Sequence, residues 1–266
     1  YNDIIAGLRT PDANAALAAA VGHAEELAPA IYALADKFCR GVYLLPTDSA
    51  LLFNGLHVLA AARHPGLCDH LIEIARQSDE ELNQLFPHHA PNSLTRLLLS
   101  VWDRDAAALF MLIEHADMVP DAKWALYNVL ARLTFDGRIA RAETSAFLAR
   151  IERDNLLDDV DMTWWGWEEA VVKLGLVELE PALVRVWAKP VYEHHENEDR
   201  AEQVEIFRRA VADPSDATAL EEEDIRAIDD PVEAVSWIER RAAAMAAWDA
   251  EHRQEDGEAA EEDRHG

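Results

Sequence analysis

Residues 121–187 read DAKWALYNVLARLTFDGRIARAETSAFLARIERDNLLDDVDMTWWGWEEAVVKLGLVELEPALVRVW, and this stretch decides the fold. Its apolar residues recur every three or four positions, which is the spacing of an α-helix face. They predict two successive helix pairs, Asp121 to Phe135 with Arg141 to Arg153, and Asp161 to Leu174 with Glu180 to Ala188. The second pair repeats the apolar pattern of the first, so we expect an all-α fold.

The same pattern extends along the chain as a repeat. In the second helix of each predicted pair, Leu71, Leu109, Phe147 and Leu183 are separated by 38, 38 and 36 residues. Two helices with a period near this value are typical of HEAT or armadillo stacks, whose period is about 40 residues. We therefore predict a HEAT/armadillo-like α-α superhelix, a solenoid of about four to five helix pairs.

The chain divides by composition into a body and a tail. We predict one α-solenoid domain over residues 1–250, with a repeat core over about 48–190 and a C-terminal helical cap over about 200–250. Apolar residues between Ile225 and Ile238 are expected to fold back and shield the last repeat. Residues 251–266 are acidic and contain no apolar side chain larger than alanine. This composition predicts a disordered acidic tail.

The charge is strongly acidic and is concentrated near the C-terminus. The chain has 51 acidic and 24 basic residues, a formal net charge of -27. Residues 192–266 hold 24 acidic and 8 basic residues and so carry -16, which leaves -11 for residues 1–191. Such a charge repels nucleic-acid phosphates and anionic lipid headgroups. We therefore expect no nucleic-acid or membrane partner, and the charge favours a basic protein partner.

The cysteines and the apolar runs indicate a reduced, aqueous compartment. Cys39 and Cys68 are the only cysteines, and neither lies in a C-x-x-C pair, so neither a disulfide framework nor a thiolate zinc site is expected. No run approaches the roughly 18 apolar residues that span a bilayer, and the N-terminus lacks the pattern of a signal peptide. These features predict a cytoplasmic protein.

Four segments carry a family resemblance: Thr95 to Ala116, Ala125 to Arg153, Trp165 to Trp187, and Glu222 to Trp237. Their order of features resembles the family of uncharacterised bacterial proteins catalogued as domain of unknown function 1186. The resemblance covers roughly Asp48 to Trp237. It implies a HEAT-like helical fold of unassigned function, and the family offers no active-site residues to carry over. Some relatives end in a cysteine-rich SEC-C metal motif, which this chain lacks.

Two histidine clusters are the candidate metal ligands. His88 and His89 lie between two prolines, and His194, His195 and Glu198 lie in an acidic stretch. Imidazoles and carboxylates are the ligands that zinc and similar metals use. The alternative for both clusters is a solvent-exposed loop, since neither has helical support to fix ligand geometry. The motifs of the common hydrolases and nucleotide-binding proteins do not occur, so we expect no cofactor.

Three tryptophans in four residues are the most unusual local feature. Trp164 and Trp167 can share a helix face with Val171, whereas Trp165 points about 100° away. One interpretation buries two rings and leaves the third partly exposed. The other makes Trp165 an anchor for a partner, because exposed aromatic residues are frequent binding hot spots.

The leading functional hypothesis is a non-catalytic helical-repeat scaffold that binds another protein through its concave face. Trp165, Arg132 and Arg185 are the predicted contact residues. One alternative is a metal-dependent enzyme or metal-binding protein that uses the cluster from His194 to Asp199. A second is an acidic competitor of nucleic acid for a basic partner.

Overall fold

A computed structural model describes residues 2–10, 13–87, 90–115, 117–193, 197–236 and 240. The described part of the chain is all-α and contains no β-strand, as the sequence predicts. Its α-helices are α1 (Asn2–Leu8), α2 (Asn14–Ala20), α3 (Ala24–Cys39), α4 (Pro46–Ala61), α5 (Leu67–Ala75), α6 (Asp79–Leu85), α7 (Ala90–Val101), α8 (Ala106–His115), α9 (Pro120–Phe135), α10 (Arg141–Arg153), α11 (Thr163–Leu174), α12 (Glu180–Val186), α13 (Asn197–Ala212) and α14 (Thr218–Glu222). Three short 3-10 helices join them, η1 (Val21–His23), η2 (Val177–Leu179) and η3 (Pro190–Tyr192).

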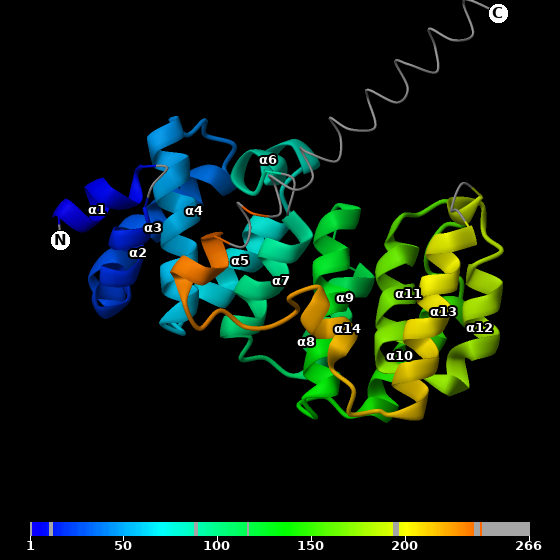
Figure 1. Cartoon of the computed structure of the whole chain (residues 1–266). Coiled ribbons are helices and arrows are strands. Elements are labelled where there is room, and N and C mark those ends of the chain that lie inside the picture. Colours follow the sequence, from blue (N-terminus) through cyan, green and yellow to red (C-terminus); the bar gives the residue numbers. More distant parts are fainter. Residues whose placement is uncertain are drawn as a thin grey trace, which may run out of the picture.

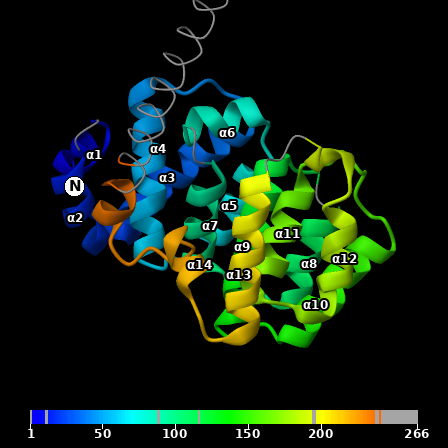
Figure 2. The same cartoon turned by 45° about the vertical axis from the view of Figure 1, so that its right-hand side comes forward.

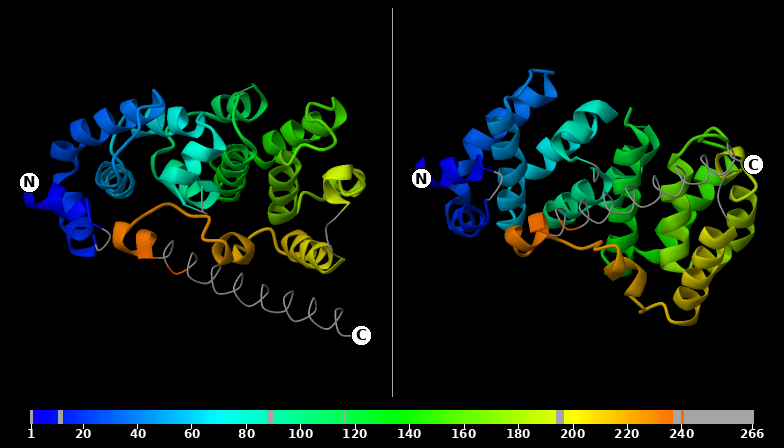
Figure 3. Two further views of the ribbon diagram at one scale, coloured as in Figure 1. Left: turned by 90° about the horizontal axis from the view of Figure 1, so that it is seen from above. Right: turned by 45° about the horizontal axis from the view of Figure 1, so that its top comes forward.

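The helices form two rows that lie side by side and follow the same curved line (Figure 1). In what we call the inner row, α4 contacts α7, α7 contacts α9, and α9 contacts α11. We call α3, α5, α8, α10 and α12 the outer row, because each of them contacts a helix of the inner row. Seen from above, residues 213–236, which follow α13, run along the side of the inner row that faces away from the outer row (Figure 3). The chain therefore alternates between the rows and then returns across one of them.

All four residues of the predicted repeat column are buried. Leu71, Leu109, Phe147 and Leu183 lie on α5, α8, α10 and α12, and each is at most 4% exposed. The residues that follow these four, Ile72, Phe110, Leu148 and Val184, are also apolar but less uniformly buried, because Val184 is 58% exposed. This residue lies on α12, the last helix of the outer row in the described part, where no further helix covers it. Burial therefore follows the apolar pattern most closely inside the stack.

Helix ends follow local sequence signals. Pro46 and Pro120 begin α4 and α9, where the missing N–H of proline costs no helical hydrogen bond. The α6 helix begins with a capping box between Ser78 and Glu81. Gly175 ends α11 in the left-handed conformation, with φ of 56°. A Cβ at this glycine would lie 2.5 Å from the backbone of Ala210, so glycine also permits the close approach of α13.

The tryptophan cluster divides as its helical spacing predicts. Trp164 and Trp167 are fully buried, and Trp165 is half-buried. The buried indoles donate hydrogen bonds to backbone carbonyls, Trp164 to Asp158 at 2.9 Å and Trp167 to Leu148 at 3.0 Å. Both rings are therefore anchored between α11 and the preceding unit.

The structure also differs from the sequence predictions in several places. The polar stretches 78–81 and 213–223, which the sequence indicates as connections between helices, contain the start of α6 and the whole of α14. In the region of the expected C-terminal cap, α13 packs on α11, and the carbonyl oxygen of Ile225 accepts from Arg132 of α9. The backbone N–H of Ile228 donates to Ser100 of α7 at 2.8 Å. The acidic tail and the predicted cap residues Trp237 and Ile238 lie outside the described residues.

Candidate functional site

The three residues predicted to contact a partner lie in three different places. Trp165, on α11, lines a cavity at one end of the inner row. Arg132, on α9, donates to the carbonyl oxygen of Ile225 at 3.4 Å. Arg185, on α12, pairs with Glu152 of α10, with N–O distances of 2.7 and 2.9 Å. The structure thus separates Arg185, on the outer row, from the other two residues.

The predicted metal ligands cannot be placed against one another. His88, His89, His194 and His195 lie outside the described residues, as does the side chain of Glu198 at the start of α13. Within the described ranges, no group of three or more His, Cys, Asp or Glu side chains is arranged to hold a metal ion. The metal hypothesis for the two histidine clusters stays a prediction.

The two cysteines are free thiols. Burial, followed by the charges of nearby carboxylates, first Glu73, raises the pKa of Cys39 to about 11. Burial also raises the pKa of Cys68. Because the thiolate is the nucleophilic form, neither side chain is activated for catalysis near neutral pH.

A single segment crosses the inner row, and we call residues 213–236 the strap. It leaves the end of α13, passes α11 and α9 by way of α14, and reaches α7 and α4 (Figure 2). Nine of its 24 residues are acidic and one is basic. The inner row meets this acidic strap with three arginines and a lysine, Arg63, Arg96, Arg132 and Lys173. Charge complementarity therefore holds the strap in place.

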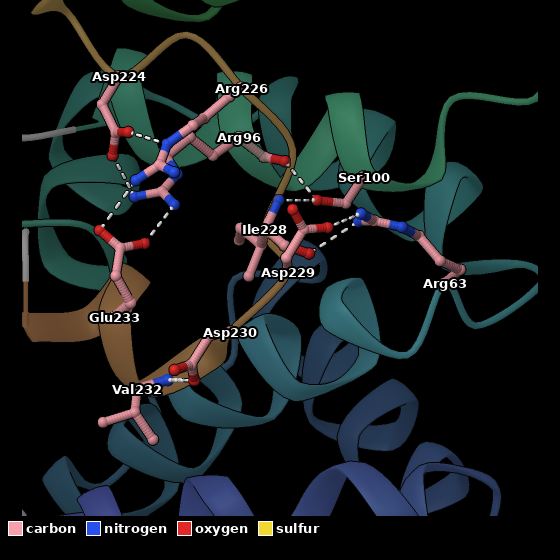
Figure 4. A network of polar contacts seen from close by, with 10 residues as sticks. All are labelled: Arg63, Arg96, Ser100, Asp224, Arg226, Ile228, Asp229, Asp230, Val232 and Glu233. Atoms are coloured by element: carbon pink, nitrogen blue, oxygen red, sulfur yellow. Dashed lines mark hydrogen bonds and ion pairs between the residues drawn. The ribbon is translucent and has the colours of Figure 1, made fainter. Parts of the chain in front are cut away.

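A buried arginine is the centre of the strap contact. Arg96, on α7, is 3% exposed and donates to the Asp224 carboxylate and to Glu233 at 2.9 Å (Figure 4). Arg226 of the strap bonds the same two carboxylates, Asp224 and, at 3.1 Å, Glu233. The Asp224 side chain is also buried, at 7% exposure. Two guanidinium groups and two carboxylates thus neutralise one another, with Arg96 and Asp224 buried and Arg226 and Glu233 partly exposed.

The inner row also recognises the strap backbone. Ser100 accepts from the Ile228 N–H at 2.8 Å and donates to the Arg96 carbonyl at 2.7 Å (Figure 4). Arg63 donates to the Ile228 carbonyl at 2.8 Å and to the Asp229 carboxylate at 2.7 Å. A buried backbone group without a partner would cost free energy, so these contacts allow an irregular segment to lie against the helices.

A buried lysine holds the strap to α11, next to the Arg96 contact. The Lys173 ammonium donates to the carboxylates of Glu169 and Glu223, each at 2.6 Å. Burial alone would lower the pKa of Lys173, but the two carboxylates outweigh burial and raise it. Lys173 is therefore charged at neutral pH, and it ties Glu223 of the strap to the framework.

A polar cavity of about 660 Å³ opens beside the strap. Arginines from both sides line it, Arg63, Arg132 and Arg138 from the framework and Arg226 from the strap. Strap and framework carboxylates, including Asp136, Asp224 and Asp229, lie among them. The strap thus leaves part of the inner row accessible to solvent.

A second cavity, of about 220 Å³, lies between α9, α11 and α13. Trp124 and Trp165 meet there edge to face, with ring centroids 6.3 Å apart. Gly166 permits this approach, because a Cβ there would lie 2.8 Å from Tyr127 Cδ2 and 3.2 Å from Trp124 Cα. Trp187 and Tyr192, from the segment after α12, complete the aromatic lining. We call this cavity the aromatic pocket.

Two carboxylates in the aromatic pocket orient its rings. Glu169 accepts from Trp124 Nε1 at 2.7 Å. Glu168 is buried and accepts from Trp187 Nε1 and from the Tyr192 hydroxyl. Burial, followed by the charge of Glu168, raises the pKa of Tyr192, so the phenol stays protonated and able to donate. The lining is therefore aromatic and acidic at once.

The residues that sequence analysis missed are charged side chains within apolar helices. Ser93, Arg96 and Ser100 recur at spacings of three and four and form a buried polar stripe along α7. On α11, Glu169 and Lys173 follow the predicted contact residue Trp165 at intervals of four residues. A search for polar stripes at helical spacing would have found both sets. Nothing in the sequence would have shown that the strap covers the first.

Comparison with known protein families, curated proteins and solved structures finds no match to this chain. The resemblance to the family of domain of unknown function 1186 therefore stays a prediction. Among the described residues, no helix combines the length and the apolar character needed to cross a bilayer.

Proposed function

We propose that the protein is a HEAT/armadillo-like scaffold whose inner row binds an extended acidic segment of a partner protein. The observation that carries the proposal is the strap, because residues 213–236 already occupy the inner row as such a segment would. In this proposal the strap and the partner segment compete for the same contacts, and the scaffold has no catalytic role and no cofactor.

The alternation of two helix rows supports the superhelical part of the proposal. Helices of the inner row stack directly on one another, and the outer helices fill the spaces behind them. Helical repeats of this kind present an extended concave surface that suits a long, unfolded segment of a partner. The buried repeat column from Leu71 to Leu183 agrees with equivalent packing in successive units.

The nature of the strap contacts supports an extended ligand. Arg63, Ser100 and Arg132 bond backbone atoms of the strap, which any sequence can supply. Arg96 and Lys173 bond its carboxylates, which select acidic residues. Backbone contacts of this kind supply affinity, and the charged contacts supply specificity.

The overall charge of -27 favours a basic region elsewhere in the same partner. A segment with alternating acidic and basic blocks would satisfy both the arginines of the inner row and the net negative charge of the chain. The predicted basic partner is thus retained, and the acidic segment is what the inner row itself would recognise.

The test is binding of a labelled peptide with the sequence of residues 213–236 to the whole chain. The host is the double variant Asp224→Asn with Glu233→Gln, in which the strap loses the carboxylates that hold Arg96. Fluorescence anisotropy should show the peptide binding this variant at least about tenfold more tightly than the unaltered chain, whose own strap competes. Circular dichroism would verify that the variant is folded.

Two controls define the result. A peptide carrying the same Asn and Gln replacements should bind weakly, because it cannot pair with Arg96. The chain with Asp229→Asn should behave as the unaltered chain, since Asp229 is 90% exposed and its loss leaves the Arg96 contacts intact. A folded double variant that does not bind the acidic peptide would exclude the proposed function.

A further inference from the structure

The aromatic pocket has a chemistry that the strap contacts do not use. Its described lining includes Trp124, Trp165, Trp187 and Tyr192, together with Glu168 and Glu169. We propose that this pocket binds an alkylated ammonium group, the chemical group shared by choline and by a methylated lysine side chain.

The charge of the pocket selects a cation. Glu168 and Glu169 contribute two carboxylates, and Arg200 contributes one guanidinium, so the described lining has one negative charge in excess. The Lys173 ammonium behind Glu169 is balanced by Glu223 of the strap. An anion would meet two carboxylates at close range, and the chain as a whole carries -27. The field at the pocket therefore attracts cations.

The aromatic rings select an organic cation. A cation within about 6 Å of a ring centroid is attracted by the negative face of the ring, and tryptophan gives the strongest attraction. Arg200 already takes this position, with its guanidinium carbon 5.8 Å from the Trp187 centroid. Alkylated ammonium ions are weakly hydrated at the surface, and aromatic cages are a general solution for binding them.

The size of the pocket limits the ligand to one small group. Its volume of about 220 Å³ lies below the roughly 300–1,000 Å³ of sites that enclose drug-sized molecules. A bare metal ion is disfavoured because indole N–H groups already bind the carboxylates, Trp124 on Glu169 and Trp187 on Glu168. An ammonium head with alkyl groups matches both the size and the mixed lining.

This inference goes beyond the proposed function and does not depend on it. The pocket is built from α9, α11, α13 and the segment after α12, and none of its described lining residues belongs to the strap. Failure of the peptide to bind the inner row would leave the pocket intact.

The test uses the whole chain and three probes. Choline represents a free alkylammonium compound, and a short peptide with one trimethyllysine represents a protein-borne group. The third probe is the neutral isostere of choline, in which carbon replaces nitrogen. Binding is followed by calorimetry and by the NMR signals of the indole N–H groups, which report directly on Trp124, Trp165 and Trp187.

Two variants and one control locate the binding. Trp165→Leu keeps an apolar side chain but removes the ring, and Glu168→Gln removes one charge with little change of shape. Each should weaken binding of the ammonium probe by roughly tenfold, within the range expected of a desolvated cation–π contact. The control, Glu73→Gln, removes the same charge from an exposed site on α5 and should have little effect.

The outcomes distinguish the two sources of the ligand. Binding of choline but not of its isostere, lost in both variants, establishes the site for a free amine. Binding of the trimethyllysine peptide alone assigns the site to a protein tail. Equal binding of the neutral isostere would overturn the proposal, because the pocket would then select only apolar shape. Absence of any ammonium binding at about 10 mM would overturn it as well, since that concentration nearly fills a site of millimolar affinity.

Discussion

The middle of the inner row and its end at the aromatic pocket present charges of opposite sign. Its middle, on α4, α7 and α9, presents arginines and is covered by the acidic strap. Its end, on α11, presents carboxylates among aromatic rings and encloses a cavity. One helix takes part in both, because α11 carries Lys173 under the strap and Trp165 in the aromatic pocket.

The difference shows how burial and charge are coupled in this fold. Where a charged segment of the chain covers the helices, the framework supplies the opposite charge in buried pairs. In the aromatic pocket, which the strap does not line, the carboxylates outnumber the guanidinium groups. A buried charge needs a partner at short range, so replacing a charged residue under the strap is predicted to lower stability strongly. Around the aromatic pocket, stability is predicted to depend instead on how closely the side chains pack.

The largest expected effect comes from Arg96→Met. This change leaves the buried Asp224 carboxylate with only the half-exposed Arg226 guanidinium, so the expected cost is about 3 kcal/mol, the lower end of the range for a broken buried pair. Urea denaturation would measure the loss. The matched control is Arg185→Met, whose pair with Glu152 involves an arginine side chain that is 59% exposed, and it should cost less than about 1 kcal/mol. Equal losses in the two variants would contradict the importance of the covered region.

The second effect is a pH dependence from His57 on α4. Burial, together with the charge of Arg96, lowers the pKa of His57 from 6.5 to about 4, against a hydrogen bond to the Phe53 carbonyl that raises it. The folded protein therefore holds the neutral imidazole, while the unfolded chain takes up a proton near pH 6.5. The resulting stability is fully present above pH 6.5 and is lost as the pH falls from 6.5 toward 4, up to about 3 kcal/mol.

Comparison with His57→Gln isolates this contribution. Between pH 7 and pH 4.5, the unfolding free energy should fall by about 2–3 kcal/mol more in the unaltered chain than in the variant. The other titrating groups are common to both proteins and largely cancel in the difference. A pH profile identical in the two proteins would show that His57 does not carry this dependence.

The third effect tests packing at the pocket end. In Gly166→Ala the new Cβ would meet Tyr127 at 2.8 Å and the Trp124 backbone at 3.2 Å. Such overpacking should cost about 1–3 kcal/mol and push α11 away from α9. The control is Gly22→Ala, where a Cβ would meet nothing within 4 Å. Thermal unfolding should separate the two, and a neutral Gly166→Ala would mean that the helices are not held at this distance.

The smallest effect is expected at the exposed edge of the strap. Asp229→Asn removes an ion pair with Arg63 in which Asp229 is 90% exposed, so stability should change by less than about 1 kcal/mol and less still at high salt. The Ile228 amide, which is bonded to Ser100, should remain protected from hydrogen exchange in this variant. Rapid exchange of this amide in the variant would show that the exposed pair of Asp229 with Arg63, and not the buried contacts, holds the strap in place.

Much of the local structure could be predicted from the sequence. The spacing of Leu71, Leu109, Phe147 and Leu183 identified positions that are all buried, and the separation of Trp165 from its two neighbours is confirmed. The site was harder to predict, because Arg96 and Lys173 are charged residues within apolar helices and look like errors in the pattern. Arg185, predicted as a contact residue, lies instead on the outer row with Glu152.

The sequence by itself determined which segments are helical and which face of each helix is apolar, because both follow from contacts between residues three and four apart. Only the tertiary structure decided where the strap lies. Its partners are separated by large distances in sequence, for example Arg96 from Asp224, and a charge pairs with whichever opposite charge folding brings close. A short acidic segment is compatible with many such pairings, so its position depended on the arrangement of the completed helix rows.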